Sequence, residues 1–151
     1  KMLIRGACPF VIMGTERARP LLLNTPPFKG RTYAPLFIEP LDLARPAERK
    51  IFIEHCAGFD LKLVEHGIFP KPSGLVRGAI PAVLYDISQG VIGTASAVFE
   101  VAAENAIRAG RSAVSLDDIS DAIDAWAIPL QFTDYNPITQ GLREIRPRRQ
   151  T

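Results

Sequence analysis

The sequence predicts an α/β fragment followed by an all-α region: two buried strands and then a bundle of four helices. Two observations predict this order. Short continuous apolar runs bounded by glycine or proline occur before residue 41, and such runs are typical of strands buried on both faces of a parallel sheet. After that point apolar residues recur every three or four positions, which is the helical period. We therefore expect three regions: residues 1–41, residues 42–128 and an irregular basic tail over 129–151.

The first predicted strand is the apolar run that ends at Gly14-Thr15, and a short helix over residues 16–23 follows it. A proline-rich break comes next, and residues 33–38 form the second predicted strand. Two strands cannot make a stable sheet by themselves, since a parallel sheet needs more strands and covering helices. We therefore expect the rest of the sheet to come from residues before Lys1 or from another chain.

Four helices are predicted after residue 42. Pro46 stands in the first turn of the first helix, where its missing N–H costs nothing. A loop rich in turn-forming residues separates this helix from the second, which runs from about Leu75 to Ser88. The third runs from about Ile92 to Ala109 and has small residues on its buried stripe. Ser115 caps the fourth helix, because its hydroxyl oxygen can accept orphan N–H groups, and Pro129 ends it.

Composition excludes several classes of protein. Hydrophobic residues make up 47% of the chain and charged residues 23%, which is close to the average of soluble globular proteins. No apolar run approaches the roughly 18 residues that are needed to cross a bilayer. The sequence therefore predicts a soluble, cytoplasmic protein with no membrane partner. Two cysteines and two histidines lack the close spacing of zinc ligands, so no metal site is expected.

The formal net charge of +2 is unevenly distributed along the chain. The last ten residues hold four arginines against Glu144, which gives +3, so the remaining residues carry about −1. A short basic tail is usually a solvated terminus, but it can also bind phosphates and release their counterions. The candidate DNA-contacting residues are Arg143, Arg146, Arg148 and Arg149.

Motifs for nucleotide hydrolysis and for nucleophilic catalysis are missing from the sequence. The phosphate-binding loop GxxxxGK[ST] is absent, and the nearest string, Lys29-Gly30-Arg31-Thr32, has the lysine and glycine in the wrong order. The serine motif GxSxG is absent as well. The run Ala82–Asp86 imitates a strand that ends in a magnesium-binding acid, but its helical surroundings favour a helix interior. By itself the chain is expected neither to bind nor to hydrolyse ATP.

Arg31 is the one candidate that its position alone suggests. It lies on a predicted loop just before the second strand, and loops at strand ends carry a disproportionate share of functional groups. A guanidinium there could reach the phosphates of a neighbouring subunit and stabilise transferring charge. The alternative interpretation is an ordinary surface arginine.

Four segments carry a resemblance to a known family: Pro9–Glu16, Ser88–Gly93, Ala106–Arg111 and Leu116–Asp118. Their order and spacing resemble the second half of an AAA+ ATPase, and more closely that of the TniB-like transposition ATPases, relatives of TnsC. The resemblance covers about residues 1–128. It implies the last two strands of the sheet of a P-loop NTPase, followed by a helical lid domain over residues 42–128.

The resemblance also implies roles for individual residues. Thr15 falls at the sensor-1 position, where a polar side chain would orient the attacking water. Arg31 falls where such ATPases place the arginine finger that acts on a neighbouring subunit. The sensor-2 position is occupied by Gly93 or Thr94, which departs from AAA+ proteins with an arginine there. The family uses ATP and Mg, and its phosphate-binding loop and acidic strand would lie before Lys1.

The function expected from this resemblance is the sensor and lid portion of an ATP-binding protein that regulates DNA transposition. Such a protein assembles as a homo-oligomer on target DNA and contacts a transposase. One alternative is a non-enzymatic helical module that binds another protein and touches DNA with its basic tail. Another is the lid of a different AAA+ ATPase, such as a helicase loader or a secretion ATPase.

Overall fold

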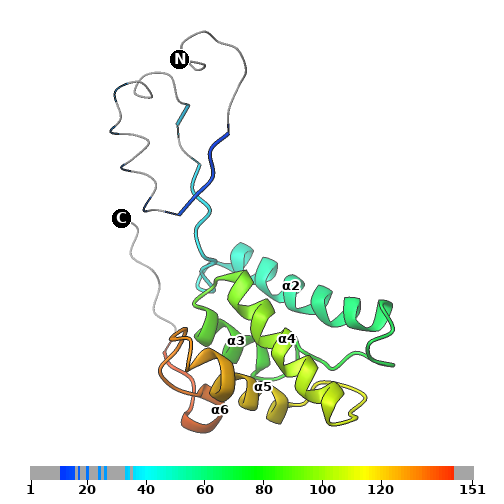
Figure 1. Ribbon diagram of the computed structural model, residues 1–151. Helices are drawn as coiled ribbons and strands as arrows, with labels where there is room; N and C mark the ends of the chain where they lie inside the picture. Colours follow the sequence, from blue (N-terminus) through cyan, green and yellow to red (C-terminus); the bar gives the residue numbers. More distant parts are fainter. Residues whose placement is uncertain are drawn as a thin grey trace. The chain divides into compact units, whose positions relative to one another are not determined.

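The computed structural model describes residues 36–144 together with 11–15, 17, 20, 24, 26, 33 and 34. The chain divides into two compact units, residues 1–38 and residues 39–151. The helices whose bounds the structure describes lie in the second unit, which Figure 1 shows as a group of packed helices.

The second unit is built around one central helix. Helix α4 packs against α2, α3, α5 and the π-helical turn η2, and α3 packs against α6 (Figure 1). The helices span Pro46–Glu65 (α2), Ile80–Ser88 (α3), Ile92–Arg108 (α4), Leu116–Ala122 (α5), Ile123–Ala127 (η2) and Pro137–Gln140 (α6).

The core lies on the small-residue stripe of α4, as the helical period predicts. Ala95, Ala102 and Ala106 are fully buried there, and their small side chains let the neighbouring helices approach closely. Aromatic pairs fill the space beside this stripe. Phe59 stacks on Phe99 with ring centroids 5.5 Å apart, an offset arrangement that contributes beyond its buried area. The core is therefore a continuous apolar cluster that joins all four long helical segments.

Most predicted helix boundaries in this unit are confirmed. Pro46 begins α2, and Ala82–Asp86 lies inside α3. Ser115 caps α5 through a capping box in which its hydroxyl accepts from the backbone N–H of Asp118. The predicted second helix begins five residues late, at Ile80, because residues 75–79 form turns instead.

The end of the unit differs from the prediction in two places. Residues 123–127 adopt a π-helical turn rather than continuing as α-helix, with the N–H of Ile128 donating to the carbonyl of Ile123 at 3.0 Å. The region expected to be irregular also contains α6, which begins at Pro137 after a side-chain cap from Asn136. A four-residue helix gives too short a periodic pattern to be seen in the sequence.

The predicted fold class, two strands of a parallel sheet followed by a helical lid, is wrong. None of the described residues forms a β-strand. Val11 and Met13 are 87% and 90% exposed, and Tyr33 and Ile38 are 98% and 94% exposed. A strand exists only when its backbone pairs with another strand, and an apolar run predicts burial without supplying that partner. The predicted helix over 16–23 lies largely outside the described residues.

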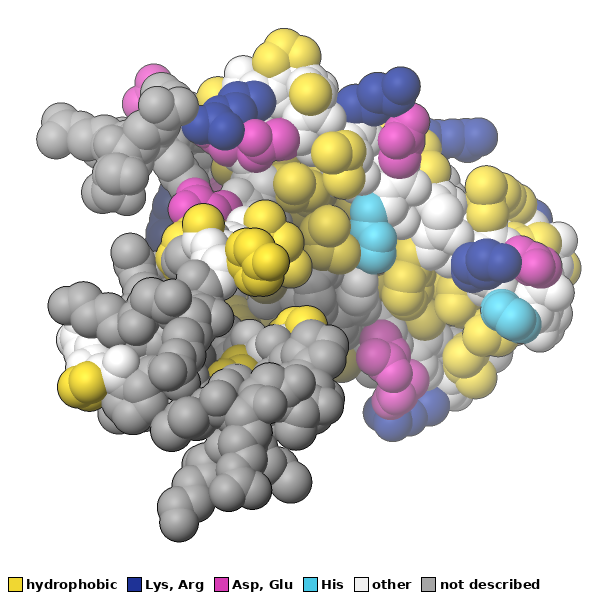
Figure 2. Space-filling model, turned by 90° about the horizontal axis from the view of Figure 1, so that it is seen from above, with side chains coloured by type: hydrophobic (Ala, Val, Ile, Leu, Met, Phe, Trp, Pro, Cys, Tyr) yellow, Lys and Arg dark blue, Asp and Glu magenta, His cyan; other side chains and the backbone are white. Residues whose placement is uncertain are grey.

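Charges on the face that carries α2 are mixed. Figure 2 shows cationic and anionic side chains side by side over this face. Helix α2 contributes ion pairs one turn apart, Lys50 with Glu54 and Lys62 with Glu65. Exposed pairs of this kind contribute little to stability. Within the described residues, no helix is long and apolar enough to span a bilayer.

Candidate functional site

The structure places the predicted site residues in different parts of the chain. Thr15 belongs to the first unit and is exposed. Gly93 and Thr94 lie in the first turn of α4, and Arg143 lies in the segment after α6. Arg31 and the tail residues Arg146, Arg148 and Arg149 lie outside the described residues. Two places in the second unit therefore remain as candidates: the start of α4 and the surroundings of Arg143.

The start of α4 is joined to the segment that leads into the helical unit. The backbone N–H of Leu41 donates to the carbonyl of Gly90 at 2.9 Å. Gly90 has φ = +81°, which favours glycine, and a Cβ at this position would overlap the backbone of Leu41. No larger residue fits at position 90 without a shift of the backbone. This explains why the turn Ser88-Gln89-Gly90 ends in glycine.

In the first turn of α4, the N–H of Thr94 donates to the Val91 carbonyl at 3.1 Å, which leaves the N–H groups of Ile92 and Gly93 as candidates for an outside partner. Val91 occupies the N-cap position, and no side chain of the described residues caps the helix. Gly93 is exposed, and a Cβ there would meet open space. Uncapped N–H groups at the positive end of a 17-residue helix can contact an anion. This edge could therefore lie against a phosphate, although no arginine stands at the sensor-2 position.

The described residues do not form a complete site for ATP and Mg. They contain no group of three or more His, Cys, Asp or Glu side chains that could hold a metal ion. The sequence has no phosphate-binding loop either. The start of α4 could thus supply one contact to a nucleotide, but the described residues do not form a phosphate cradle around it.

The second candidate is a cluster that we name the Asp86 clasp, made of Asp86, Asp134, Tyr135 and Arg143. Asp86 lies on α3 and is only 7% exposed. Its Oδ2 accepts hydrogen bonds from the Tyr135 hydroxyl and from the backbone N–H of Arg143, the latter at 2.8 Å. The Arg143 guanidinium lies 3.8 Å above the Tyr135 ring and pairs with the Asp134 carboxylate. The clasp holds the last described segment against α3.

Electrostatics differ between the inner and outer parts of the clasp. Burial raises the pKa of Tyr135 to about 12, and its hydrogen bond to Asp86 adds to the shift. On the outside, the hydrogen bond from Arg143 lowers the pKa of Asp134. Oδ1 of Asp86 is buried and has no hydrogen-bond partner among the described residues. An unpaired buried carboxylate oxygen is costly. Only one of the two oxygens of Asp86 therefore has its hydrogen-bonding capacity satisfied.

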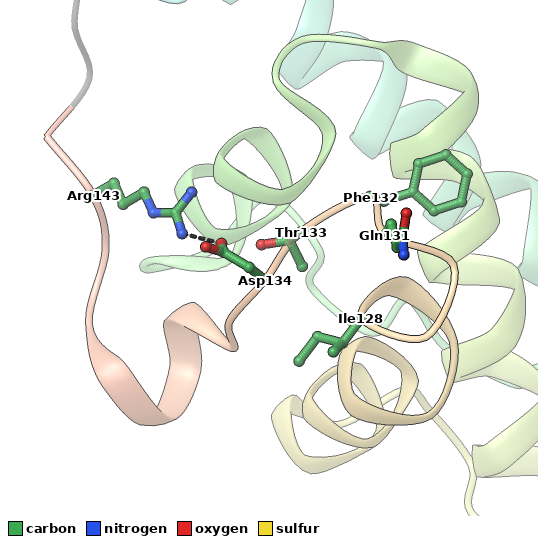
Figure 3. A pocket seen from close by; sticks show the side chains of 6 residues that line it. All are labelled: Ile128, Gln131, Phe132, Thr133, Asp134 and Arg143. Atoms are coloured by element: carbon green, nitrogen blue, oxygen red, sulfur yellow. Dashed lines mark hydrogen bonds and ion pairs between the residues drawn. The ribbon is translucent and has the colours of Figure 1, made fainter.

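A shallow recess lies beside the clasp, lined by Ile128, Gln131, Phe132, Thr133, Asp134 and Arg143. Figure 3 shows Arg143 and Asp134 pointing toward one another across its edge, while the Phe132 ring points away from them. Phe132 stacks on Trp126 with ring centroids 4.9 Å apart. The recess is open to solvent, and it lacks the enclosed apolar lining that is typical of small-molecule sites.

Among the other buried carboxylates, Asp60 and Asp118 are structural. Asp60 accepts the backbone N–H groups of Ser73, Gly74 and Leu75 at 2.7–3.2 Å and fixes the turn that precedes α3. Burial alone would raise the pKa of Asp118, but hydrogen bonds from Arg111 and Ser115 outweigh it and hold the pKa below its usual value. The partners of these two carboxylates lie outside the two candidate sites.

Sequence reasoning found Arg143 but missed the other three members of the clasp. Tyr135 and Asp86 are 49 residues apart, so no local pattern joins them. The one available signal was the acid inside the apolar run Ala82–Asp86, since a carboxylate on a buried helix face needs a partner. Comparisons of this chain with protein-family models, with curated proteins and with solved structures find no match.

Proposed function

We propose that this chain is the C-terminal portion of a TniB-like AAA+ ATP-binding protein that regulates DNA transposition. Residues 42–128 act in this proposal as a lid that contacts the nucleotide through the start of α4. Arg31 acts as an arginine finger toward a neighbouring subunit, and Thr15 as sensor 1. The complete protein binds ATP and Mg, assembles on target DNA and contacts a transposase.

The observation that carries this proposal is the pairing of Leu41 with Gly90. It fixes the segment that leads into the helical unit onto the turn directly before α4. Lids act by moving as units about a few residues at their connection to the rest of the enzyme. The hydrogen bond ties the segment around Leu41 to the turn before α4. When that segment moves, the exposed first turn of α4, which contains Gly93, would therefore move with it.

The proposed role of Arg31 can be tested in the protein that carries a phosphate-binding loop ahead of this segment. Arg31→Ala should lower kcat for ATP hydrolysis on the order of 10³-fold and leave the ATP dissociation constant unchanged, because a finger acts on the transition state. The control is Arg77→Ala, an exposed arginine of the second unit. Unchanged hydrolysis by Arg31→Ala would remove the arginine-finger assignment.

The chain as it stands should show no ATP binding by calorimetry, since it has no phosphate-binding loop. A dissociation constant in the micromolar range would overturn that expectation and would require a phosphate cradle of another kind.

The proposed DNA contact depends on the arginines from Arg143 onward. Deletion of residues 143–151 should weaken binding to duplex DNA and reduce the slope of log K against log salt by about 1 for each phosphate that the tail neutralises. An unchanged slope would show that the tail does not touch DNA.

A second candidate function is the helical interaction module. It is favoured by the core, whose described buried members run from Leu43 to Ala127. The coding sequence ahead of Lys1 separates the two functions. An in-frame GxxxxGK[ST] followed by an acidic strand supports the ATPase, whereas a start codon without either supports the module.

A further inference from the structure

Helix α2 has one face in the core and one face outside it. The inner face carries Phe52, Cys56 and Leu63 into the core and packs on α4. By the helical period, the opposite side, which we name the outer face of α2, holds Lys50, Glu54, Gly58, Leu61, Lys62 and Glu65. We propose that this outer face binds the same face of a second copy of the chain, with the two α2 helices antiparallel and crossing near Gly58. The inference goes beyond the proposed function, because it involves neither nucleotide nor DNA.

Apolar side chains on the outside of α2 are the first observation that carries the proposal. Leu61 is 58% exposed, and Ile51, at the border of the outer face, is 48% exposed. A surface helix normally keeps its apolar residues on one stripe that faces the core. Figure 2 shows hydrophobic side chains among the charged ones over this face of the molecule. Helix α2 thus carries apolar surface that the described residues leave open to solvent.

Gly58 is the second observation. It lies inside the 20-residue helix, where glycine is less favourable than alanine. Its φ is not in the left-handed region, and a Cβ on it would meet open space. The packing of the described residues therefore does not require a glycine here. A position without a side chain on the outer face lets a second helix approach closely, because the distance between packed helices depends on the side chains at their contact.

The order of charges on the outer face identifies a second copy as the partner. Along the helix it reads plus, minus, plus, minus, and the list is Lys50, Glu54, Lys62 and Glu65. In an antiparallel pair, residues about equally far before and after Gly58 lie opposite one another. Lys50 then faces Glu65 of the second copy, and Glu54 faces Lys62, whereas a parallel pair would bring like charges together.

The same four side chains are free to make these contacts without losing the ones that they have. They are between 62% and 75% exposed, and each lysine already pairs with a glutamate of its own helix. An isolated exposed pair contributes little, but charges that form a network contribute more. The second copy would join the two pairs of each helix into such a network.

The size of the contact sets the expected affinity. A helix of 20 residues is about 30 Å long, and one pair of such helices buries less than about 1,200 Å², the range of weak complexes. A contact between two identical faces closes at two chains, whereas head-to-tail assembly continues into rings or filaments. We therefore expect the isolated chain to form a reversible dimer with a dissociation constant on the order of 10 to 100 μM.

Sedimentation velocity of the full chain from about 1 μM to about 1 mM measures this association. Lys50→Glu and Glu65→Lys should each weaken it at least about tenfold, because each variant sets like charges opposite one another at both ends of a symmetric contact. The control is Lys71→Glu, the same charge change on an exposed residue outside α2. It should leave the dissociation constant within about twofold of the wild-type value.

An equimolar mixture of Lys50→Glu and Glu65→Lys should recover the wild-type association, because each substituted position of one chain then faces the oppositely charged substituted position of the other. Any effect within a single helix is the same in the mixture as in the separate variants, so recovery requires a contact between two chains. A mixture that associates no better than either variant alone would overturn the proposal. A wild-type chain that stays monomeric at about 1 mM would overturn it as well.

Gly58→Gln tests the crossing point without changing any charge. Its Cβ has open space within the chain, so the fold should tolerate it, but its side chain would hold two antiparallel helices apart and weaken the dimer at least about tenfold. Unchanged association of Gly58→Gln would overturn the proposed crossing. None of these outcomes affects the ATPase proposal, which depends on the Arg31→Ala experiment.

Discussion

Two buried aspartates of the helical unit, Asp60 and Asp86, hold loops against helices in different ways. Asp60 accepts three backbone N–H groups and uses both of its carboxylate oxygens. Asp86 places both of its donors on one oxygen and leaves the other dry. A carboxylate with both oxygens paired acts as a staple, by which we mean that it fixes its loop to the helix. Any movement of the loop would leave buried N–H groups without an acceptor. A carboxylate with one unpaired buried oxygen, such as Asp86, loses less hydrogen-bond free energy when its loop moves away, because both of its oxygens then reach water.

The largest effect that this comparison predicts follows removal of the Asp60 carboxylate. Asp60→Ala leaves three backbone N–H groups without their acceptor and should destabilise the fold by about 3 to 5 kcal/mol. Asp60→Asn keeps one acceptor oxygen and should cost roughly half as much. The free energy of unfolding in urea measures both. A loss below about 1 kcal/mol for the alanine variant would contradict the role of a staple.

The next effect concerns Gly90, in the turn after α3 that bonds to the backbone of Leu41. Gly90→Ala introduces a Cβ that overlaps the Leu41 backbone at φ = +81°, and it should cost about 2 to 3 kcal/mol. Gly78→Ala is the control, because Gly78 also has positive φ but open space around it. It should cost only about 1 kcal/mol. Equal losses of stability for Gly90→Ala and Gly78→Ala in thermal unfolding would mean that the Leu41 backbone can shift to make room for the new Cβ.

A third prediction uses Asp118, a buried carboxylate that is fully paired. Its pKa lies below the usual value in the folded state, so its stabilisation is present above the unfolded pKa of about 4 and is lost as the pH falls below it. Asp118→Asn should lower stability at pH 7 by about 1 to 2 kcal/mol and flatten the decline at acid pH. The check is the free energy of unfolding measured from pH 7 to pH 3. An unchanged acid slope in Asp118→Asn would contradict this assignment.

The smallest effect is expected at Asp86. Asp86→Asn removes a buried charge with a dry oxygen while it keeps an acceptor for Tyr135 or Arg143, so the loss and the gain nearly cancel. The expected change is about 1 kcal/mol or less. A larger loss than that of Asp60→Asn, measured in the same urea series, would contradict the view that Asp86 holds its loop more weakly than Asp60 does.

The sequence predicted the helices well because their signals are local. The proline at Pro46, the serine cap at Ser115 and the alanine stripe of α4 each act within one or two turns, and the structure has helices at all three places. The prediction of two strands was wrong because a strand depends on a partner that can lie far away in the sequence. The apolar runs around Val11 and Leu36 say nothing about a pairing partner, and both residues are about 90% exposed.

Prediction of the candidate sites had the same limit. Gly93 and Thr94 followed from a sequence resemblance, and Arg143 from the charge of the tail, but neither route leads to Asp86 or Tyr135. The clasp depends on a contact across 49 residues of sequence, and a pattern within one window cannot contain it. The dry oxygen of Asp86 is a property of packing alone.

Hydrogen exchange at two backbone amides tests the difference between Asp60 and Asp86 most directly. The Gly74 N–H donates to Asp60 and the Arg143 N–H donates to Asp86. The Arg143 amide should be protected at least about tenfold less than the Gly74 amide, because a loop held by one carboxylate oxygen opens more easily than a loop held by both. Equal protection of the two amides, or stronger protection of Arg143, would contradict this difference.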